Sequence, residues 1–418
     1  MARPGTRHGE LNIDFFRFVD RNVGGVLCPL LTACHRFANV LPGKTIQKPP
    51  KKILIIKLSE MGSTVLAYPA FLHLQRRWGP IELFFLTFHE NKDIVSALAV
   101  TPDSRIVTIR HSRLLDLLRD ILRAFLRLKS ERIDVTLDMD FFSRLTAALA
   151  FLICRGSRVG FHAYTEEGLY RGDLLTHRVL YNPHLHTSHA FLTLAHALDG
   201  KELNEPLLKT TVAVDSRDIP SYTPNPEAKE SMRHRISDYL AQAGPWKTLV
   251  LVNPNSSAIF PLRKWPLGHF AAFCRLLLSA RSDVAIALTG SKSEVDDAAF
   301  ITSHLDNVRC FSLAGQTTFN ELLALYSIAK LMVTNDSGPA HFAALLRLPT
   351  VVLFGPETPR LYKPLGDFCK VVYAGLACSP CVSVYNNKKS TCTDNQCLSS
   401  IDPQKVLQEA LSSLPPLG

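Results

Sequence analysis

The stretch that decides the fold is Val333-Thr334-Asn335-Asp336-Ser337-Gly338-Pro339-Ala340-His341. The largely apolar run from Ala329 to Val333 predicts a buried strand, and the run from Pro339 to Leu345 predicts a helix. The first amides of such a helix have no intrahelical partner, and the helix dipole adds positive charge there. A strand, a turn and a helix start of this kind favour an anion such as a phosphate. The alternative is that Asp336 or Ser337 only caps the helix.

An earlier segment also has a predicted strand that is followed by a polar turn. The run Thr248–Val252 predicts a strand, which is followed by Asn253-Pro254-Asn255-Ser256-Ser257 and then by Pro261-Leu262-Arg263-Lys264-Trp265-Pro266. Small hydroxyl and amide side chains at the end of a strand contact ligands in the crevice where open α/β sheets bind them. Arg263 and Lys264 would neutralise a diphosphate there. The alternative is an ordinary solvated basic loop.

A third junction lies between these two. Residues Ala285 to Leu288 predict a strand that ends in Thr289-Gly290-Ser291-Lys292-Ser293-Glu294. The carboxylate of Glu294 would accept hydrogen bonds from ribose hydroxyls. Alternatively, Glu294 is an ordinary carboxylate in the first turn of a helix.

In this order, the three segments resemble the C-terminal half of glycosyltransferase family 9, the family of the ADP-heptose:lipopolysaccharide heptosyltransferases. The likeness continues through SLAGQTTFNELLAL at residues 312–325 and VTNDSGPAHFAALLRLPTVVLFGPETP at residues 333–359. Residues 52–70 are similar to the family's opening strand, glycine turn and helix, so the resemblance covers about residues 50 to 415. It implies an α/β protein of the GT-B type, in which two Rossmann-like domains with parallel sheets face each other across a cleft.

The resemblance also implies the chemistry. A nucleotide diphosphate sugar, with ADP-heptose among the candidates, would bind the C-terminal domain, and lipopolysaccharide or a related glycolipid would accept the sugar at the N-terminal domain. The transfer would be inverting and would need neither a metal nor a cofactor. The donor-binding residues expected on this basis are Asn255, Ser256, Ser257, Arg263, Lys264, Glu294, Asp336, Ser337, Gly338 and His341.

The catalytic base departs from the family pattern. The family usually has an aspartate directly after the turn glycine, whereas Ser63 follows Gly62 here. A serine hydroxyl has too high a pKa to act as an unaided base. Glu60 is the nearest carboxylate and is the predicted base, unless it only caps the helix or faces solvent. His89, Asp138 and Asp140, at the ends of later strands, are held in reserve.

Two other functions remain open at this point. One is a nucleotide-sugar-binding protein that lost catalysis when Ser63 replaced the aspartate. The other is a GT-B epimerase that acts on the sugar nucleotide itself, which would need several acid and base residues.

Short apolar runs alternate with helical stretches along the chain, which predicts parallel sheets. The expected division is an amphipathic segment at 1–48, an acceptor domain at 49–225, a donor domain at 226–400 and a C-terminal helix at 401–418. The other expected strands are Ile53–Lys57, Ile81–Thr87, Arg105–Thr108, Asp134–Leu137, Arg158–Phe161, Val351–Phe354 and Lys370–Tyr373.

Two basic amphipathic segments suggest a membrane partner. Residues 12–41 and 113–132 interleave large apolar side chains with arginines, in a chain of net charge +10. Such helices lie on anionic bilayer surfaces, although the first could instead pack on the body of the enzyme. The apolar runs are too short or too interrupted to span a bilayer, and no signal peptide is evident. The prediction is a cytoplasmic protein, peripheral on the inner face of the cytoplasmic membrane. Dispersed basic residues without a recognition motif argue against nucleic acid.

Cysteines and histidines near each other in the sequence raise the question of a metal site. Cys378, Cys381, Cys392 and Cys397 are compatible with a structural zinc, with two disulfides or with four reduced thiols. The histidines between His177 and His189 match no zinc template and are interpreted as loop or cap residues. Arg171 and Arg178 are the expected contacts for an acidic acceptor.

Overall fold

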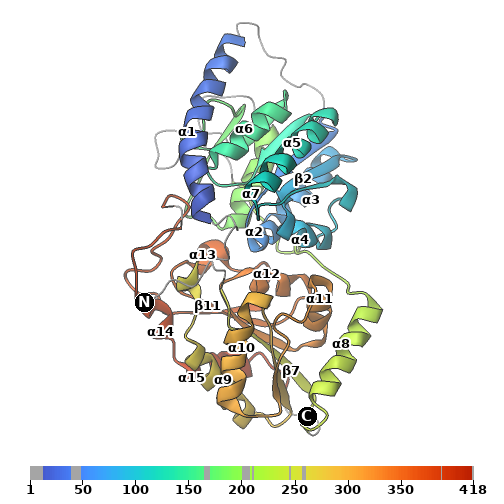
Figure 1. Ribbon diagram of the computed structural model, residues 1–418, viewed down its shortest axis with the longest axis vertical. Coiled ribbons are helices and arrows are strands. Elements are labelled where there is room, and N and C mark those ends of the chain that lie inside the picture. The colour runs from blue at the N-terminus through green and yellow to red at the C-terminus, as the bar shows by residue number, and fades with distance from the viewer. Residues whose placement is uncertain are drawn as a thin grey trace. The chain divides into compact units, whose positions relative to one another are not determined.

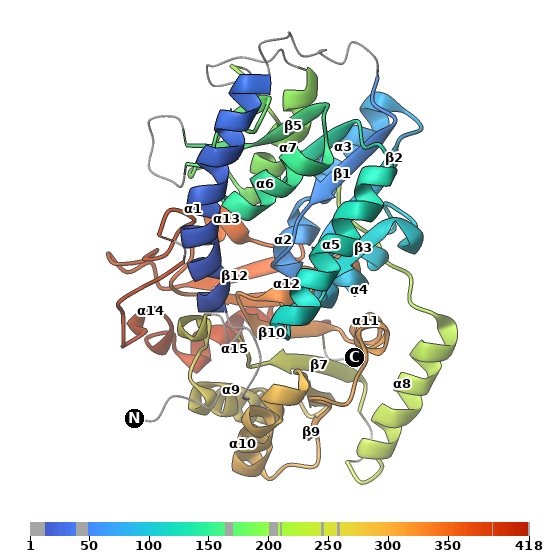
Figure 2. The same ribbon diagram turned by 45° about the horizontal axis from the view of Figure 1, so that its top comes forward.

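The computed structural model describes residues 13–38, 49–163, 170–199, 208–209, 211–243, 246–256, 260–386 and 388–416. Contacts divide the chain into two compact units, Met1–Asp218 and Ile219–Gly418. Each unit has a parallel sheet with helices on both sides (Figures 1 and 2). The domain boundaries expected after residues 48, 225 and 400 stay predictions.

The first unit has a six-stranded sheet in the order β3-β2-β1-β4-β5-β6, which is the strand order of the Rossmann fold. Its strands are β1 (Lys52–Ile56), β2 (Glu82–Phe88), β3 (Ile106–Ile109), β4 (Val135–Asp138), β5 (Ser157–His162) and β6 (His177–Leu180). The helices are α1 (Ile13–Ala38), α2 (Met61–Leu66), α3 (Tyr68–Trp78), α4 (Lys92–Ala97), α5 (Leu114–Ser130), α6 (Arg144–Ile153) and α7 (Thr187–His196), with 3-10 turns η1 (His89–Asn91), η2 (Asp103–Arg105) and η3 (Ala197–Asp199).

The second unit repeats this plan with a six-stranded parallel sheet in the order β12-β11-β10-β7-β8-β9. Its strands are β7 (Thr248–Asn253), β8 (Val284–Leu288), β9 (Cys310–Ser312), β10 (Leu331–Asn335), β11 (Thr350–Phe354) and β12 (Cys369–Tyr373). The helices are α8 (Pro226–Tyr239), α9 (Leu267–Ala280), α10 (Val295–Leu305), α11 (Phe319–Ile328), α12 (Gly338–Leu345), α13 (Pro359–Tyr362), α14 (Gln396–Ser399) and α15 (Pro403–Leu411), with η4 (Pro261–Arg263) and η5 (Lys292–Glu294).

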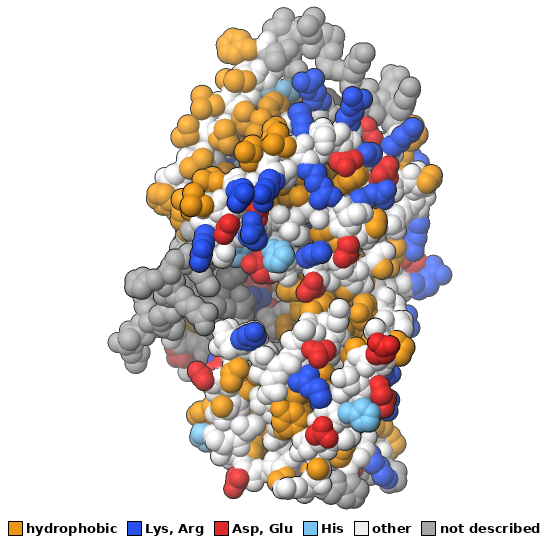
Figure 3. All heavy atoms as spheres, turned by 45° about the vertical axis from the view of Figure 1, so that its right-hand side comes forward, with side chains coloured by type: hydrophobic (Ala, Val, Ile, Leu, Met, Phe, Trp, Pro, Cys, Tyr) orange, Lys and Arg blue, Asp and Glu red, His pale blue; other side chains and the backbone are white. Residues whose placement is uncertain are grey.

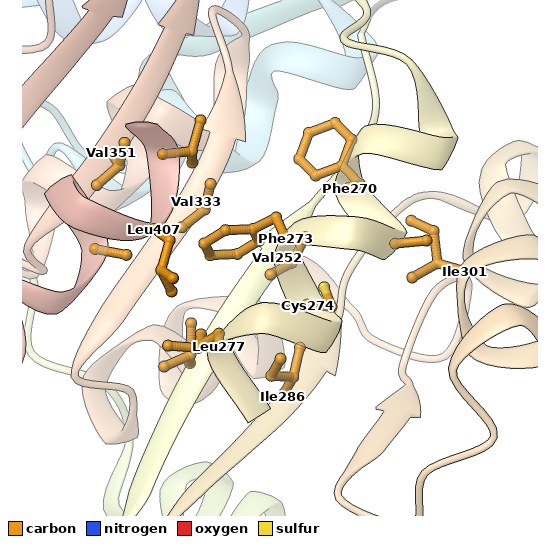
Figure 4. Packing of buried hydrophobic residues seen from close by; sticks show 14 of the residues in the cluster. Val252, Phe270, Phe273, Cys274, Leu277, Ile286, Ile301, Val333, Val351 and Leu407 are labelled. Atoms are coloured by element: carbon orange, nitrogen blue, oxygen red, sulfur yellow. The ribbon is translucent and has the colours of Figure 1, made fainter. Parts of the chain in front are cut away.

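Alternating side chains of the strands build a core on each face of the sheets. In the second unit, Phe273 and Leu277 of α9 pack against Val252, Ile286 and other strand residues (Figure 4). In the first unit, strand residues pack against α5 and α6 on one face, while Phe71 of α3 packs on Phe85 on the other. The two doubly wound units confirm the predicted α/β fold class.

Helix α1 packs against α6 in the first unit. The carboxylate of Asp20 accepts hydrogen bonds from the Ser143 hydroxyl and the Leu145 amide, both at 3.0 Å. Gly24 allows the close approach, because a Cβ there would lie 2.6 Å from the Arg144 Cβ. The described residues contain no helix that combines the length and the apolar character needed to cross a bilayer.

Candidate active site

The three junctions singled out in the sequence meet at one edge of the second sheet. Strands β10, β7 and β8 are neighbours and parallel, so their carboxyl ends point the same way. Asn335, at the end of β10, joins two of the following turns. Its Nδ2 donates to the carbonyls of Pro254 at 3.0 Å and Asn255 at 3.1 Å, and its Oδ1 accepts from the Trp265 amide at 3.0 Å.

The turns after β7 and β8 also touch. Asn255 Nδ2 donates to the carbonyl of Thr289 at 3.2 Å. A Cβ at Gly290 would lie 2.7 Å from that same Nδ2 and 3.2 Å from Glu294 Oε2, so a larger residue at this position would displace these side chains. Ser256 follows in the same turn and is partly buried, whereas Ser257 lies outside the described residues.

Glu294 has a local structural role. Its Oε2 accepts the Ser291 amide at 2.7 Å in a capping box at the start of η5. This is the ordinary first-turn carboxylate that the sequence offered as an alternative. A contact of Glu294 with a ribose stays a prediction.

Unlike the start of η5, the start of α12 has no capping hydrogen bond from its N-cap side chain. Ser337 occupies the N-cap position, but its side chain makes no capping hydrogen bond; the hydroxyl donates to the Asn335 carbonyl at 3.3 Å. Asp336, Ser337 and His341 are all buried at this helix start. A Cβ on Gly338 would lie 3.1 Å from the Phe342 ring.

Buried charges gather beside this helix start. Arg263 Nη1 lies 3.2 Å from Glu357 Oε2 and 3.8 Å from Asp336 Oδ2, while Lys388 Nζ lies 3.3 Å from Glu357 Oε1. Burial raises the pKa of Asp336 well above its ordinary range; nearby Arg263 opposes this effect and Glu357 adds to it. Two buried carboxyl groups are therefore held by an arginine and a lysine.

Sequence reasoning missed Glu357 and Lys388. Glu357 follows the end of β11, and β11 pairs with β10, so the strand order would have brought it to this site. Lys388 comes from the cysteine-rich segment near the end of the chain, where the sequence gives no signal of this contact. Lys264 forms an ion pair with Asp297, and its predicted role at a diphosphate remains untested.

The turn after β1 carries the predicted base of the first unit. Glu60 is exposed and has a left-handed backbone, with φ of 66°, at the N-cap position of α2. Gly62 and Ser63 are buried in the next turn, and the Ser63 hydroxyl donates to the Glu60 carbonyl at 3.0 Å. Ser63 thus stabilises the turn, because its hydroxyl proton is hydrogen-bonded to a backbone oxygen.

The two reserve aspartates are held in ion pairs. Asp138 has no exposed surface and is bonded to Arg171. Asp140 accepts from Lys57 Nζ at 3.2 Å and from the Leu58 amide at 2.9 Å. A carboxylate held in this way is poorly suited to remove a substrate proton. Glu60 and the reserve residue His89 are both exposed, and of these two Glu60 is the carboxylate.

The expected contact between Arg171 and an acidic acceptor is wrong. The side chain of Arg171 is completely buried. Its guanidinium donates to the carbonyls of Ser143 at 2.8 Å and Phe161 at 3.1 Å, and burial lowers its pKa to about 10. Arg178 is paired with Asp173 at 3.5 Å, and its acceptor role stays a prediction.

The cysteine-rich segment contains only free thiols in the part of the chain that the structure describes. Its four cysteines do not bring three ligand atoms together as a metal site requires, whereas His73, His196 and Asp199 of the first unit do. Burial raises the pKa of Cys397 to about 11, and the neighbouring Cys381, Cys392 and Cys378 add to this effect.

The paired Rossmann-like units and the polar edge of the second sheet are those of a GT-B protein. Residues 121–391 match the model of glycosyltransferase family 9 (heptosyltransferase), and the chain belongs to this family.

Several proteins of known name are similar to the chain. Lipooligosaccharide heptosyltransferase 2 of Campylobacter jejuni is 28% identical over 170 residues, which are 40% of this chain and 51% of that protein. Lipopolysaccharide heptosyltransferase 2 of Salmonella typhimurium is 31% identical over 160 residues, 37% of this chain and 43% of that protein. The chain thus spans about half the length of these relatives.

Solved structures show the same fold. The Escherichia coli ADP-heptose lps heptosyltransferase II has a TM-score of 0.62 at 20% identity, with 87% of this chain and 98% of that chain covered. The E. coli heptosyltransferase WaaC with ADP has a TM-score of 0.61 at 17% identity, with 87% and 99% covered.

Proposed function

We propose that this protein transfers a heptose-like sugar from a nucleotide diphosphate to lipopolysaccharide or a related glycolipid. The observation that carries the proposal is the meeting of three strand ends in the second unit, where Asn255 and Glu294 lie close to Gly290 and Asp336 lies beside Arg263 just before the N-cap of α12. This edge offers amides and a guanidinium to a diphosphate, and ADP-heptose is the proposed donor because one protein of similar structure is named an ADP-heptose lps heptosyltransferase.

The proposed reaction is a single displacement without a metal. Glu60 removes the proton of the acceptor hydroxyl, whose oxygen attacks the anomeric carbon as the bond to the diphosphate breaks. This inverts the anomeric centre. Arg263, Lys264 and the first amides of α12 stabilise the charge that develops on the leaving diphosphate.

Donor binding tests the site. In titration calorimetry, ADP should bind the wild type, and both Lys264→Ala and Asp336→Ala should weaken this binding about tenfold or more. Lys264→Ala removes a cation that would face the diphosphate, and Asp336→Ala removes the buried carboxyl group that lies beside Arg263. Lys330→Ala, a change at an exposed lysine of the same unit, is the control. Equal affinity in all four proteins would remove the donor-site assignment. A binding protein without activity, or an epimerase, would pass this test but fail to form a glycosylated acceptor.

The proposed location is the cytoplasmic face of the inner membrane. Helices α1 and α5 both pack against α6, and both expose apolar side chains. On α5, Leu115 is 81% exposed and Leu118, Leu122 and Leu126 are each more than half exposed. In Figure 3 hydrophobic side chains gather in the upper unit with Lys and Arg side chains beside them.

The spacing on α5 favours a bilayer. The four leucines recur every three or four residues, so they form one stripe, and the exposed Arg119, Arg123 and Arg127 form an adjacent stripe. An apolar stripe beside a cationic one inserts at the acyl boundary while the arginines meet anionic headgroups. Phe18, Val26 and Leu30 of α1, all largely exposed, extend the apolar character to the second helix.

A further inference from the structure

Three potential metal ligands lie together in the first unit, on residues that the proposed transfer reaction does not use. Helix α3 packs against α7, and η3 directly follows α7. His73 of α3 stacks on His196 of α7 with ring centroids 3.9 Å apart and an interplanar angle of 34°. One ligand atom from each of His73, His196 and Asp199 lies within 4.8 Å of the other two.

Imidazole suits a divalent metal ion as a ligand. A neutral histidine ring has one nitrogen with a free lone pair, and that nitrogen can coordinate the ion.

His73 also has an unsatisfied atom. Its Nε2 is buried, and the described residues provide no hydrogen-bond partner for it. Buried polar nitrogens are normally satisfied, and an orphan is explained by an absent water or ion. A cation coordinated by this lone pair would satisfy it.

The carboxylate of Asp199 is oriented by a second residue. Arg77, one helical turn after His73, donates from Nε to Asp199 Oδ1 at 2.9 Å. The arginine is held in turn by its position over the Trp78 ring, 4.4 Å from the centroid. A ligating carboxylate that is hydrogen-bonded by an outer residue is the usual arrangement at metal sites.

We propose that His73, His196 and Asp199 bind one divalent transition metal ion of the zinc class. Two imidazole nitrogens and a carboxylate oxygen are a ligand set that suits Zn²⁺ and its neighbours Co²⁺ and Ni²⁺ rather than Mg²⁺ or Ca²⁺. Because the ligands come from α3 and from the end of α7, the ion ties these two helices together. The site is structural and separate from the transfer chemistry.

Zinc titration tests this site directly. The full chain is dialysed against a chelator, and Zn²⁺ binding is measured by titration calorimetry together with the thermal midpoint. Wild type should bind zinc and gain a few degrees in Tm, as expected for an ion that binds only the folded state. His196→Ala should lose one equivalent of zinc relative to wild type and most of the thermal shift.

The controls separate this site from the cysteine-rich segment and from general effects. His234→Ala, a change at an exposed histidine of α8, should behave as wild type. The test compares the number of zinc ions bound by wild type and by the variant. Any zinc held by the cysteines is the same in both proteins and does not affect this difference. If His196→Ala does not fold by circular dichroism, Asp199→Asn, at an exposed residue, decides instead. Unchanged zinc stoichiometry and affinity in the folded variant would overturn the proposal.

Discussion

At the scale of single residues, Asp336 has the most unusual environment. It is almost completely buried, and burial raises its pKa, so the folded protein favours the protonated form. Above its ordinary pKa the unfolded chain releases this proton, whereas the folded chain keeps it until the raised pKa is passed. The stabilising contribution of Asp336 to the free energy of unfolding is therefore fully present below pH 4. It is lost as the pH rises toward the raised pKa of the folded protein.

Asp336→Asn should remove this pH dependence. Between pH 5 and pH 8 the free energy of unfolding of wild type should fall relative to the variant, by up to about 1.4 kcal/mol for each pH unit. Urea denaturation at four pH values measures the difference. Asp297→Asn, at a partly exposed carboxylate paired with Lys264, is the control. If the free energy of unfolding changes with pH in the same way in wild type and Asp336→Asn, this carboxyl group is ionised in the folded protein.

Glu60 is the residue on which the chemistry of the proposal depends. Because general-base catalysis contributes roughly 10²–10⁴-fold, Glu60→Gln should lower kcat by that factor while leaving ADP affinity unchanged. Turnover and calorimetry are measured on the same preparations, with Glu131→Gln, a change at a carboxylate paired with Lys52, as the control. Near-wild-type turnover in Glu60→Gln would remove the base assignment.

Residue roles were only partly predictable from the sequence. The motif residues of the three junctions indeed lie at neighbouring strand ends, because strand order fixes their place. The ion pair between Arg171 and Asp138 was not predictable, since the two residues are 33 positions apart and no sequence pattern links them. The order of the strands would have placed Glu357 at the site, whereas the sequence gives no signal for the contact of Lys388 with Glu357.

At the scale of elements, helix α5 carries a testable surface. Leu118→Asp with Leu122→Asp should lower binding to anionic vesicles by roughly tenfold or more, because the two exposed leucines would no longer be buried in the bilayer. Co-sedimentation with phosphatidylglycerol vesicles measures this. Val308→Asp, at an exposed valine of the second unit, is the matched control. Equal sedimentation of all three proteins would exclude the membrane-facing surface on α5.

Helix α9 tests the packing of the second unit. Phe273 is completely buried against the sheet, so Phe273→Ala should lower the free energy of unfolding by about 3–5 kcal/mol. Phe300→Ala, at a phenylalanine that is 38% exposed, should cost much less. Urea denaturation compares the two, and equal losses would contradict the role of α9 in the core.

Elements were predicted better than residues. Continuous apolar runs located the longer strands to within one or two residues, because strands buried on both faces leave a clear signal. The sequence did not mark β9, which has only three residues, or β6, whose arginine and leucine are partly exposed. For α1, both alternatives hold in part: one face packs on α6 and another exposes Phe18, Val26 and Leu30.

At the scale of the whole molecule, the chain has two units with the same Rossmann strand order, which fits its family. We propose that each unit binds one of the two substrates. In the proposed function, the second unit supplies the diphosphate site at the ends of β7, β8 and β10. The first supplies Glu60 after β1 and the apolar faces of α1 and α5. We propose a nucleotide sugar and a membrane-bound glycolipid as the two substrates on the basis of these features.

The transfer reaction itself tests the proposed function most directly. Purified protein is incubated with ADP-heptose and a lipopolysaccharide acceptor that lacks the heptose, and the acceptor is analysed by mass spectrometry. We expect the acceptor to gain the mass of one heptose with release of ADP, and Glu60→Gln to form this product far more slowly. An acceptor of unchanged mass with wild-type protein that binds ADP would contradict the proposed transferase activity.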